Sequence, residues 1–319
     1  MPSSGARAFR RAYPTRSESL RALVDVVAKV VEHNAGLLII GESGSGKDHL
    51  AELVHACGPR RGASFVRIDC ASIPPELFES ELFGYEKGAF TDARTRKIGK
   101  LDLAQKGTLY LDGVAGLANT LQAKLLRVIQ EKQFSRLGGN YMLDLDARII
   151  SSASESPELL VNRGQLRSDL YYRLNVVSVE LPPLRERKDD IPMLAEEFLG
   201  ERGTALGRKF EGFDPEAMDL MLAYSWPGNV RELRNVVDRA ALLEEGTTVS
   251  PNSLPHERFL QPSDFLQSAN ERAWSLEELE KQYIREVLRR TGSNYSASAT
   301  ILGINRKTLL EKRRKYDLG

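Results

Sequence analysis

Apolar residues recur along the first half of the chain with two periods, one typical of amphipathic helices and one of buried strands. Five of them repeat at helical spacing: Leu20, Leu23, Val24, Val27 and Val31. They predict a helix from Ser17 to about Asn34. Short apolar runs predict four strands, at 37–40, 65–69, 108–111 and 148–151. Because helical segments alternate with these strands, the pattern indicates a parallel α/β sheet with crossover helices.

The second half of the chain contains only helical periods. After Pro182 and Pro183, helices without an intervening strand are predicted at 191–202, 215–224 and 229–243. This pattern is typical of a small all-helical domain beside the sheet. The stretch 244–273 has three prolines and no period, which predicts a linker. In 275–319, one amphipathic helix and two shorter helices around the turn 302–305 are typical of a helix-turn-helix.

Composition adds little to this picture. A chain of 319 residues is long for one core, so two or three domains are expected. The net charge of +1 indicates no particular partner. Two cysteines, Cys57 and Cys70, are too few for a disulfide framework and fit a reducing cytoplasm. No signal peptide and no membrane span is predicted, so we expect a cytoplasmic protein without a membrane partner.

The first candidate binding site is the run GESGSGKD, which directly follows the predicted strand 37–40. Glycines let backbone N–H groups turn toward an anion, a helix starting near Lys47 adds the positive end of its dipole, and Lys47 supplies a point charge. The pattern predicts an ATP-phosphate loop whose residues are Gly41, Glu42, Ser43, Gly44, Ser45, Gly46, Lys47 and Asp48. Asp48 replaces the usual hydroxyl ligand of Mg²⁺, and a carboxylate can serve instead. The alternative is an ordinary glycine turn.

Asp112 ends the apolar strand 108–111 and is the second candidate ligand of Mg²⁺. An acidic residue at the carboxyl end of a buried strand, downstream of a phosphate loop, is where a magnesium-holding carboxylate is needed. The alternative is a helix cap for the segment that follows.

The final helix is strongly basic, with Glu311 as its one acid among Arg306, Lys307, Lys312, Arg313, Arg314 and Lys315. Basic charge on a recognition helix meets DNA phosphates. The predicted DNA contacts are Asn305, Arg306, Lys307, Thr308, Lys312 and Arg313. The alternative is a solvated charged face, and the pattern does not say which bases are read.

Seven stretches together resemble the sigma-54-dependent transcriptional activators, bacterial enhancer-binding proteins of the NtrC type. They are GESGSGKD, ESELFGYEKGAFTDA, GTLYLDG, LRSDLYYRLNVV, LPPLRERKDDIP, WPGNVREL and the terminal helix-turn-helix. The resemblance covers about residues 16–318. It implies an AAA+ P-loop NTPase with a parallel sheet and helical lid, followed by an all-α Fis-type DNA-binding domain.

The resemblance also implies partners and a division of the chain. A homo-oligomer, from dimer to hexameric ring, would use ATP and Mg²⁺ and act on sigma-54 RNA polymerase and upstream DNA. The expected parts are a leader (1–15), an α/β subdomain (16–181), a lid (182–246), a linker (247–274) and the DNA-binding domain (275–319). Because the first predicted helix starts so early, we expect no regulatory domain before the nucleotide-binding unit.

Individual roles follow from the same resemblance. Arg167 and Arg173 match arginines that reach into a neighbouring subunit's site, and Arg231 matches one that senses nucleotide within its own subunit. The sigma-54 contact loop would be Gly88, Ala89, Phe90, Thr91, Asp92 and Ala93. The alternative for Phe90 is that it merely pins its own loop.

Five residues, at four places in the chain, depart from the family pattern. Gly113 replaces the glutamate that polarises the attacking water, Ala153 and Ser154 replace a Thr-Asn pair, Asp92 replaces Gly, and Asp69 replaces Asn. Walker B and sensor I are therefore degenerate. We expect ATP to bind and turnover to be slow, unless Asp69 serves as the base.

Three hypotheses remain open. The first is an ATP-driven activator, and the second is a hydrolysis-deficient regulator or inactive ring partner that uses ATP as a structural ligand. The third is a DNA-binding protein whose front part is a relic.

Overall fold

The computed structural model describes residues 4–255, 274–291 and 295–316. It divides into two units, Met1–Pro255 and His256–Gly319, which are described separately below. None of the helices within the described ranges is long and apolar enough to cross a bilayer.

A five-stranded parallel sheet organises the first unit, in the order β2-β5-β8-β1-β9. The strands are β1 (Leu37–Ile40), β2 (Phe65–Asp69), β5 (Thr108–Asp112), β8 (Arg148–Ala153) and β9 (Val177–Glu180). The four predicted strands and the parallel α/β class are confirmed. β9 was not predicted, since it lies at the edge and buries only part of its side chains.

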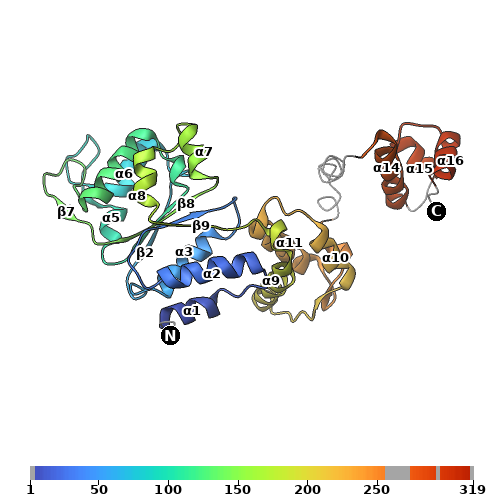
Figure 1. The fold of residues 1–319 in the computed structure, drawn as a ribbon, viewed down its shortest axis with the longest axis horizontal. Helices are drawn as coiled ribbons and strands as arrows, with labels where there is room; N and C mark the ends of the chain where they lie inside the picture. Colours follow the sequence, from blue (N-terminus) through green and yellow to red (C-terminus); the bar gives the residue numbers. More distant parts are fainter. Residues whose placement is uncertain (1–3, 256–273, 292–294, 317–319) are drawn as a thin grey trace. The chain divides into compact units, whose positions relative to one another are not determined.

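Helices cover both faces of this sheet (Figure 1). One face carries α1 (Ser4–Ala12), α2 (Glu18–Val30) and α3 (Lys47–Ala56). The other face carries α4 (Pro75–Phe83), α5 (Lys100–Leu103), α6 (Asn119–Glu131), α7 (Pro157–Asn162) and α8 (Ser168–Leu174). Residues 4–12, which the sequence assigns to a leader, form α1 and bury Phe9 completely in the core shared with α2.

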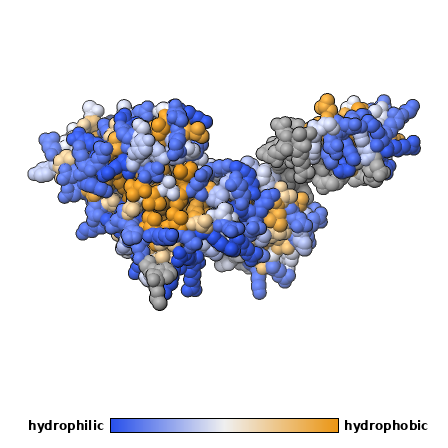
Figure 2. Space-filling view, in the orientation of Figure 1, coloured by the Kyte–Doolittle hydropathy of each residue, from blue (hydrophilic) through white to orange (hydrophobic). Residues whose placement is uncertain are grey.

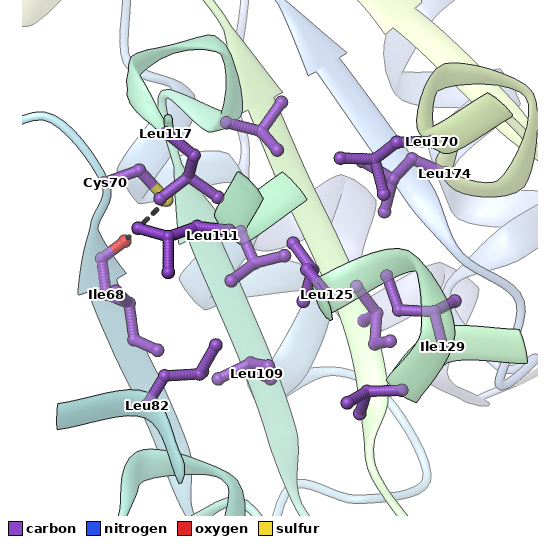
Figure 3. Close-up of a cluster of buried hydrophobic side chains, with 14 of the residues drawn as sticks. Ile68, Cys70, Leu82, Leu109, Leu111, Leu117, Leu125, Ile129, Leu170 and Leu174 are labelled. Carbon is purple, nitrogen blue, oxygen red and sulfur yellow. Dashed lines mark hydrogen bonds between the residues drawn. The ribbon is translucent and has the colours of Figure 1, made fainter. Parts of the chain in front are cut away.

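The core of the second face lies between the sheet and α6 and α8 (Figure 3). Apolar side chains of β5, such as Leu109 and Leu111, pack with Leu125 of α6 and Leu170 of α8. Two short hairpins, β3–β4 (Gly84–Tyr85, Lys97–Ile98) and β6–β7 (Gln133–Phe134, Leu143–Asp144), extend from this layer.

The lid follows β9 through two short 3-10 turns, η2 (Leu184–Glu186) and η3 (Lys188–Asp190). Its helices, α9 (Ile191–Leu206), α10 (Pro215–Ala223) and α11 (Asn229–Leu243), confirm the three predicted ones. The strand-free prediction is wrong, since β10 (Gly212–Phe213) pairs with β11 (Thr248–Val249).

Residues 247–255, assigned to the linker from sequence, belong to the lid instead. They form β11 and the turn η4 (Pro251–Ser253). Glu244 fixes this segment by accepting hydrogen bonds from the Ser250 N–H at 2.8 Å and the Ser253 hydroxyl at 2.7 Å. These bonds, led by that of the Ser250 backbone, lower the pKa of Glu244 to about 2. The rest of the predicted linker, 256–273, lies outside the described residues.

The second unit contains α14 (Leu276–Arg290), α15 (Tyr295–Ile301) and α16 (Arg306–Lys315). The three helices share a small core made by Ile284, Leu288, Ala299, Leu309 and Tyr316. Gly303 adopts a left-handed conformation (φ +66°) after α15, which glycine tolerates at a helix end. This arrangement confirms the predicted helix-turn-helix.

Candidate functional site

The candidate site is built on the loop between β1 and α3. Gly44 and Gly46 adopt left-handed conformations, with φ +76° and +105°, which are available to glycine without steric cost. A Cβ atom on Gly44 would lie 2.4 Å from the carbonyl oxygen of Gly228 in the lid. Lys47 begins α3 directly after the loop. The first-turn N–H groups of α3 therefore adjoin a loop that only glycine can form.

Lys47 is the cation of this loop. Its buried Nζ donates to the carbonyl oxygens of Gly41 at 2.7 Å and Glu42 at 2.9 Å. Burial lowers the pKa of Lys47, against the opposing charge of Asp112. Ser45 Oγ is also buried and has no hydrogen-bond partner among the described residues. A buried ammonium held by neutral carbonyls and an unpaired hydroxyl both suit an anion, so the loop fits the phosphates of ATP.

Three lid side chains hold the loop from the other side. Asn229 Nδ2 donates to Glu42 Oε2 and to the Ser43 carbonyl oxygen, both at 3.1 Å. Arg231 Nη1 donates to Ser43 Oγ at 3.1 Å, and Arg185 forms an ion pair with Glu42 at 2.6 Å. Arg231 thus lies beside the loop of its own chain. Asn229 and Arg185 were not predicted, although both fall within the matched stretches WPGNVREL and LPPLRERKDDIP.

Two adjoining cavities open next to the loop. The first, of about 400 Å³, is lined by Tyr13, Arg187 and Asp190. The second, of about 520 Å³, is lined by Lys47 and Asp112. The two share Gly46, His49, Val230 and Arg234. Each volume lies within the range of about 300–1,000 Å³ that small-molecule sites occupy.

The wall of the first cavity could not be found by sequence reasoning. The ring of Tyr13 lies 5.8 Å from that of His49, and Arg187 Nη2 donates to the Ser45 carbonyl oxygen at 2.5 Å. Asp190 accepts from the Thr15 hydroxyl at 2.8 Å. Tyr13 and Thr15 lie in the predicted leader, which carries no motif, so only folding shows that Tyr13 borders the loop and that Thr15 contacts Asp190.

A cluster of polar side chains surrounds the two predicted magnesium ligands. Arg67 Nη2 lies 2.8 Å from Asp48 Oδ2 and 2.5 Å from Asp112 Oδ2. Tyr110 donates its hydroxyl to Asp48 Oδ1 at 2.9 Å and to Asp112 Oδ1 at 3.3 Å. Ser152 donates to Asp112 Oδ1 at 2.8 Å. Burial alone would raise the pKa of Asp112, but the hydrogen bonds from Ser152 and Arg67 lower it below the ordinary value.

This cluster does not fit Mg²⁺ as it stands. Carboxylate oxygens are the ligands that Mg²⁺ prefers, yet each of the four oxygens of Asp48 and Asp112 already accepts a hydrogen bond or ion pair. An ion on the two Oδ2 atoms would face the Arg67 guanidinium, and like charges repel. Magnesium at Asp48 and Asp112 therefore stays a prediction from sequence, and it requires Arg67 to move.

Asp69, the predicted alternative base, lies next to Asp112 because β2 and β5 pair in that register. Its Oδ1 accepts from the N–H groups of Ala71 at 3.0 Å and Ser72 at 3.1 Å, which is a turn-forming arrangement typical of Asp and Asn. Asp69 lines the second cavity together with Lys47. The structure therefore brings Asp69 into the candidate site, and its role as a base stays a prediction.

Gly113 and Ser154 line the same cavity, whereas Ala153 is buried in the sheet. Gly113 has φ +70°, and its N–H donates to Ser152 Oγ at 2.9 Å. A Cβ atom at Gly113 would meet nothing within 4 Å. A glutamate at 113 would thus have space but would need a backbone conformation that side-chain-bearing residues rarely adopt.

Arg167 and Arg173 lie elsewhere. Both are exposed near α8; Arg167 pairs with Asp169 at 2.7 Å, and Arg173 Nη2 donates to the Ile129 carbonyl oxygen at 3.5 Å. Neither belongs to the described residues that line the loop cavities. They do not reach the loop of their own chain, so their predicted role requires a second subunit.

Residues 88–93 form a tight turn between β3 and β4 that is largely exposed, although Ala93 is buried. The N–H of Gly88 donates to the Ala93 carbonyl oxygen at 2.8 Å, and that of Ala93 to the Phe90 carbonyl oxygen at 3.0 Å. The Phe90 side chain is 46% exposed, and its ring meets that of Tyr85 edge-on at 4.9 Å. Phe90 therefore pins the loop and still presents an apolar surface to solvent.

The predicted DNA contacts divide into two groups. Arg306 and Lys307 are exposed at the start of α16, where Asn305 caps the helix by accepting from the Thr308 N–H at 2.8 Å. Lys312 pairs with Glu280 at 2.6 Å, and the Arg313 guanidinium lies 5.2 Å from the Tyr295 ring centre. Figure 2 shows mainly hydrophilic residues over α16. The first turn of α16 is thus the more open part of the candidate DNA surface.

Three family models match consecutive parts of the chain. Residues 14–180 match the sigma-54 interaction domain, residues 185–272 the AAA+ ATPase lid domain, and residues 275–316 the bacterial regulatory protein, Fis family.

Curated relatives are similar over nearly the whole chain. The transcriptional regulatory protein ZraR of Klebsiella oxytoca is 43% identical over 93% of this chain and 67% of that protein. The regulatory protein AtoC of Escherichia coli (strain K12) is 40% identical over 95% of this chain and 67% of that protein. Among solved structures, NtrX from Brucella abortus in complex with ATP is 36% identical with a TM-score of 0.69, covering 95% of this chain and 69% of that one.

Proposed function

Because the chain belongs to the family of sigma-54-dependent transcriptional activators, we propose that it binds ATP, assembles as a ring, contacts sigma-54 RNA polymerase and binds upstream DNA. The observation that carries this proposal is the buried Lys47 in its glycine loop, beside a cavity that lid residues border. Binding of nucleotide would change the contacts that the loop and Arg231 make. Occupancy of the site would thereby be coupled to the position of the lid.

The two cavities support a placement of ATP within the site. The phosphates lie at Lys47 and the N-terminus of α3, where the ammonium exchanges loop carbonyls for phosphate oxygens. The base lies in the cavity beside Tyr13, which offers an aromatic ring and the polar groups of Arg187 and Asp190. Arg231, which lies in the lid and lines the second cavity, contacts the bound nucleotide.

Assembly is supported by exposed apolar side chains near the two arginines. Leu159 on α7, Tyr172 on α8 and Val176 after α8 are 48%, 75% and 63% exposed. Figure 2 shows hydrophobic residues gathered on the visible face of the nucleotide-binding part. Such surfaces mark interaction sites, and a neighbour packed there would receive Arg167 and Arg173 in its own nucleotide site.

The sigma-54 contact is proposed for residues 88–93 and is tested by truncating Phe90. Phe90→Ala is expected to weaken binding to purified sigma-54 by at least tenfold, because a buried aromatic anchor contributes about 2 kcal/mol or more to an interface. Binding is measured by native gel shift with ATP present. Ile98→Ala, which truncates a 54% exposed residue on neighbouring β4, is the control and should bind normally. Equal binding by both variants would remove residues 88–93 from the proposal.

A second candidate function is a regulator that binds ATP with little hydrolysis. The observation that favours it is Gly113, which offers no side chain where the family has a catalytic glutamate. Any turnover then depends on Asp69, the carboxylate beside Asp112.

Asp69→Asn is expected to lower steady-state ATP turnover by about a hundredfold, the lower end of what a general base contributes. Asparagine can accept the same turn-forming hydrogen bonds, so the variant removes the base and keeps the turn. Phosphate release is measured beside Asp219→Asn, an exposed lid aspartate. Turnover equal to that of the parent would show that Asp69 is not the base.

A further inference from the structure

Arg67 is the one charged residue inside the otherwise apolar run 65–68 of β2. Its side chain is 41% exposed, and the guanidinium reaches the carboxyl end of the sheet. There a single nitrogen, Nη2, contacts Asp48 of α3 at 2.8 Å and Asp112 of β5 at 2.5 Å. Two carboxylates from different elements therefore share one protein cation.

Two further side chains, Tyr110 and Ser152, donate hydrogen bonds to the same aspartates. Arg67 contacts the Oδ2 atom of each aspartate, and the Tyr110 hydroxyl bridges the two Oδ1 atoms. Ser152 adds a third donor to Asp112. The side chains of Asp48 and Asp112 are 31% and 18% exposed, so the pair is partly shielded from water and a nearby counter-charge stabilises it.

We propose that Arg67 takes the place of a divalent cation between Asp48 and Asp112, so that this site binds nucleotide without metal. The inference rests on the proposed ATP site. It is an alternative to the sequence-based prediction of magnesium ligands at these two positions.

The electrostatic reason is local. Asp48 and Asp112 line the same cavity as Lys47, and two uncompensated carboxylates would repel the phosphates that Lys47 attracts. A guanidinium stays charged at any physiological pH. Arg67 therefore offsets one of the pair's two negative charges permanently, whereas a dissociable ion acts only at sufficient concentration. Loss of Arg67 leaves carboxylates that suit Mg²⁺.

The test compares binding of the fluorescent analogue mant-ADP in excess Mg²⁺ and in EDTA. For the parent protein the two dissociation constants are expected to agree within about threefold, a difference below 1 kcal/mol. For Arg67→Ala, binding in Mg²⁺ is expected to be at least about tenfold tighter than in EDTA. Arg67→Gln, which keeps a polar side chain of moderate length, is a second variant with the same expected behaviour.

Arg127→Ala is the matched control. It removes a 75% exposed arginine from α6, where Arg127 pairs with Glu131, and it should behave as the parent does. Electron paramagnetic resonance of Mn²⁺ gives a second readout: with ADP present, Arg67→Ala should bind Mn²⁺ and the parent should not. Parent protein that binds mant-ADP only with Mg²⁺ overturns the role of Arg67 and leaves the ATP site standing. Parent protein that binds in neither condition overturns the ATP site itself.

Discussion

Lys47→Ala is expected to lower the affinity for ATP by at least about a hundredfold. Hydrogen bonds to charged groups contribute about 1.5–3 kcal/mol each, so losing two phosphate contacts corresponds to two or more factors of ten. In the parent protein Lys47 is buried and donates to the Gly41 and Glu42 carbonyl oxygens, bonds that it exchanges for bonds to the phosphates when ATP binds. Isothermal titration calorimetry measures the affinity directly.

Lys29→Ala is the control for this experiment, because Lys29 is exposed on α2. It should bind ATP as the parent does. ATP-dependent assembly, followed by light scattering, should be lost in Lys47→Ala and retained in Lys29→Ala. Ring assembly and DNA binding that persist unchanged in Lys47→Ala would support the hypothesis that the front part of the chain is a relic.

Gly113→Glu is expected to raise ATP turnover by about ten- to a hundredfold. The new carboxylate would stand where the family places its water-polarising glutamate, and a positioned general base contributes about a hundredfold to ten-thousandfold. The lower range is expected because φ at Gly113 is +70°, and a left-handed conformation costs a side-chain-bearing residue about 1–2 kcal/mol. Phosphate release from purified protein is the measurement.

Gly113→Gln separates chemistry from strain. Glutamine has nearly the same size and meets the same backbone conformation, but it is no base. Turnover should therefore rise in Gly113→Glu and stay at the parent level in Gly113→Gln. A rise in both would assign the effect to the backbone, and a rise in neither would show that the missing glutamate does not limit turnover.

Much of the fold follows from local patterns. The apolar runs at 37–40 and 108–111 predict buried strands, and the glycines before Lys47 permit the left-handed turns of the phosphate loop. The three lid helices and the helix-turn-helix likewise follow from their periods. In contrast, β9, β10 and β11 are short edge elements whose pairing partners are distant in sequence.

The candidate DNA surface shows the same division. A basic last helix is visible in the sequence. That Lys312 pairs with Glu280, and that Arg313 lies on Tyr295, depends on how α16 packs against the two preceding helices. The exposed residues at its first turn could not be separated from the engaged ones by composition.

By itself, the sequence determined the phosphate loop, the parallel α/β class and the family. The signal for each is a set of short runs of contiguous residues with a characteristic spacing. Only the tertiary structure decided that Arg67 meets Asp48 and Asp112. These three residues come from β2, α3 and β5, and a strand's period states which face a side chain takes but not which strand lies beside it. The order of the strands, which places β2 beside β5, therefore determines that the Arg67 charge lies next to Asp112.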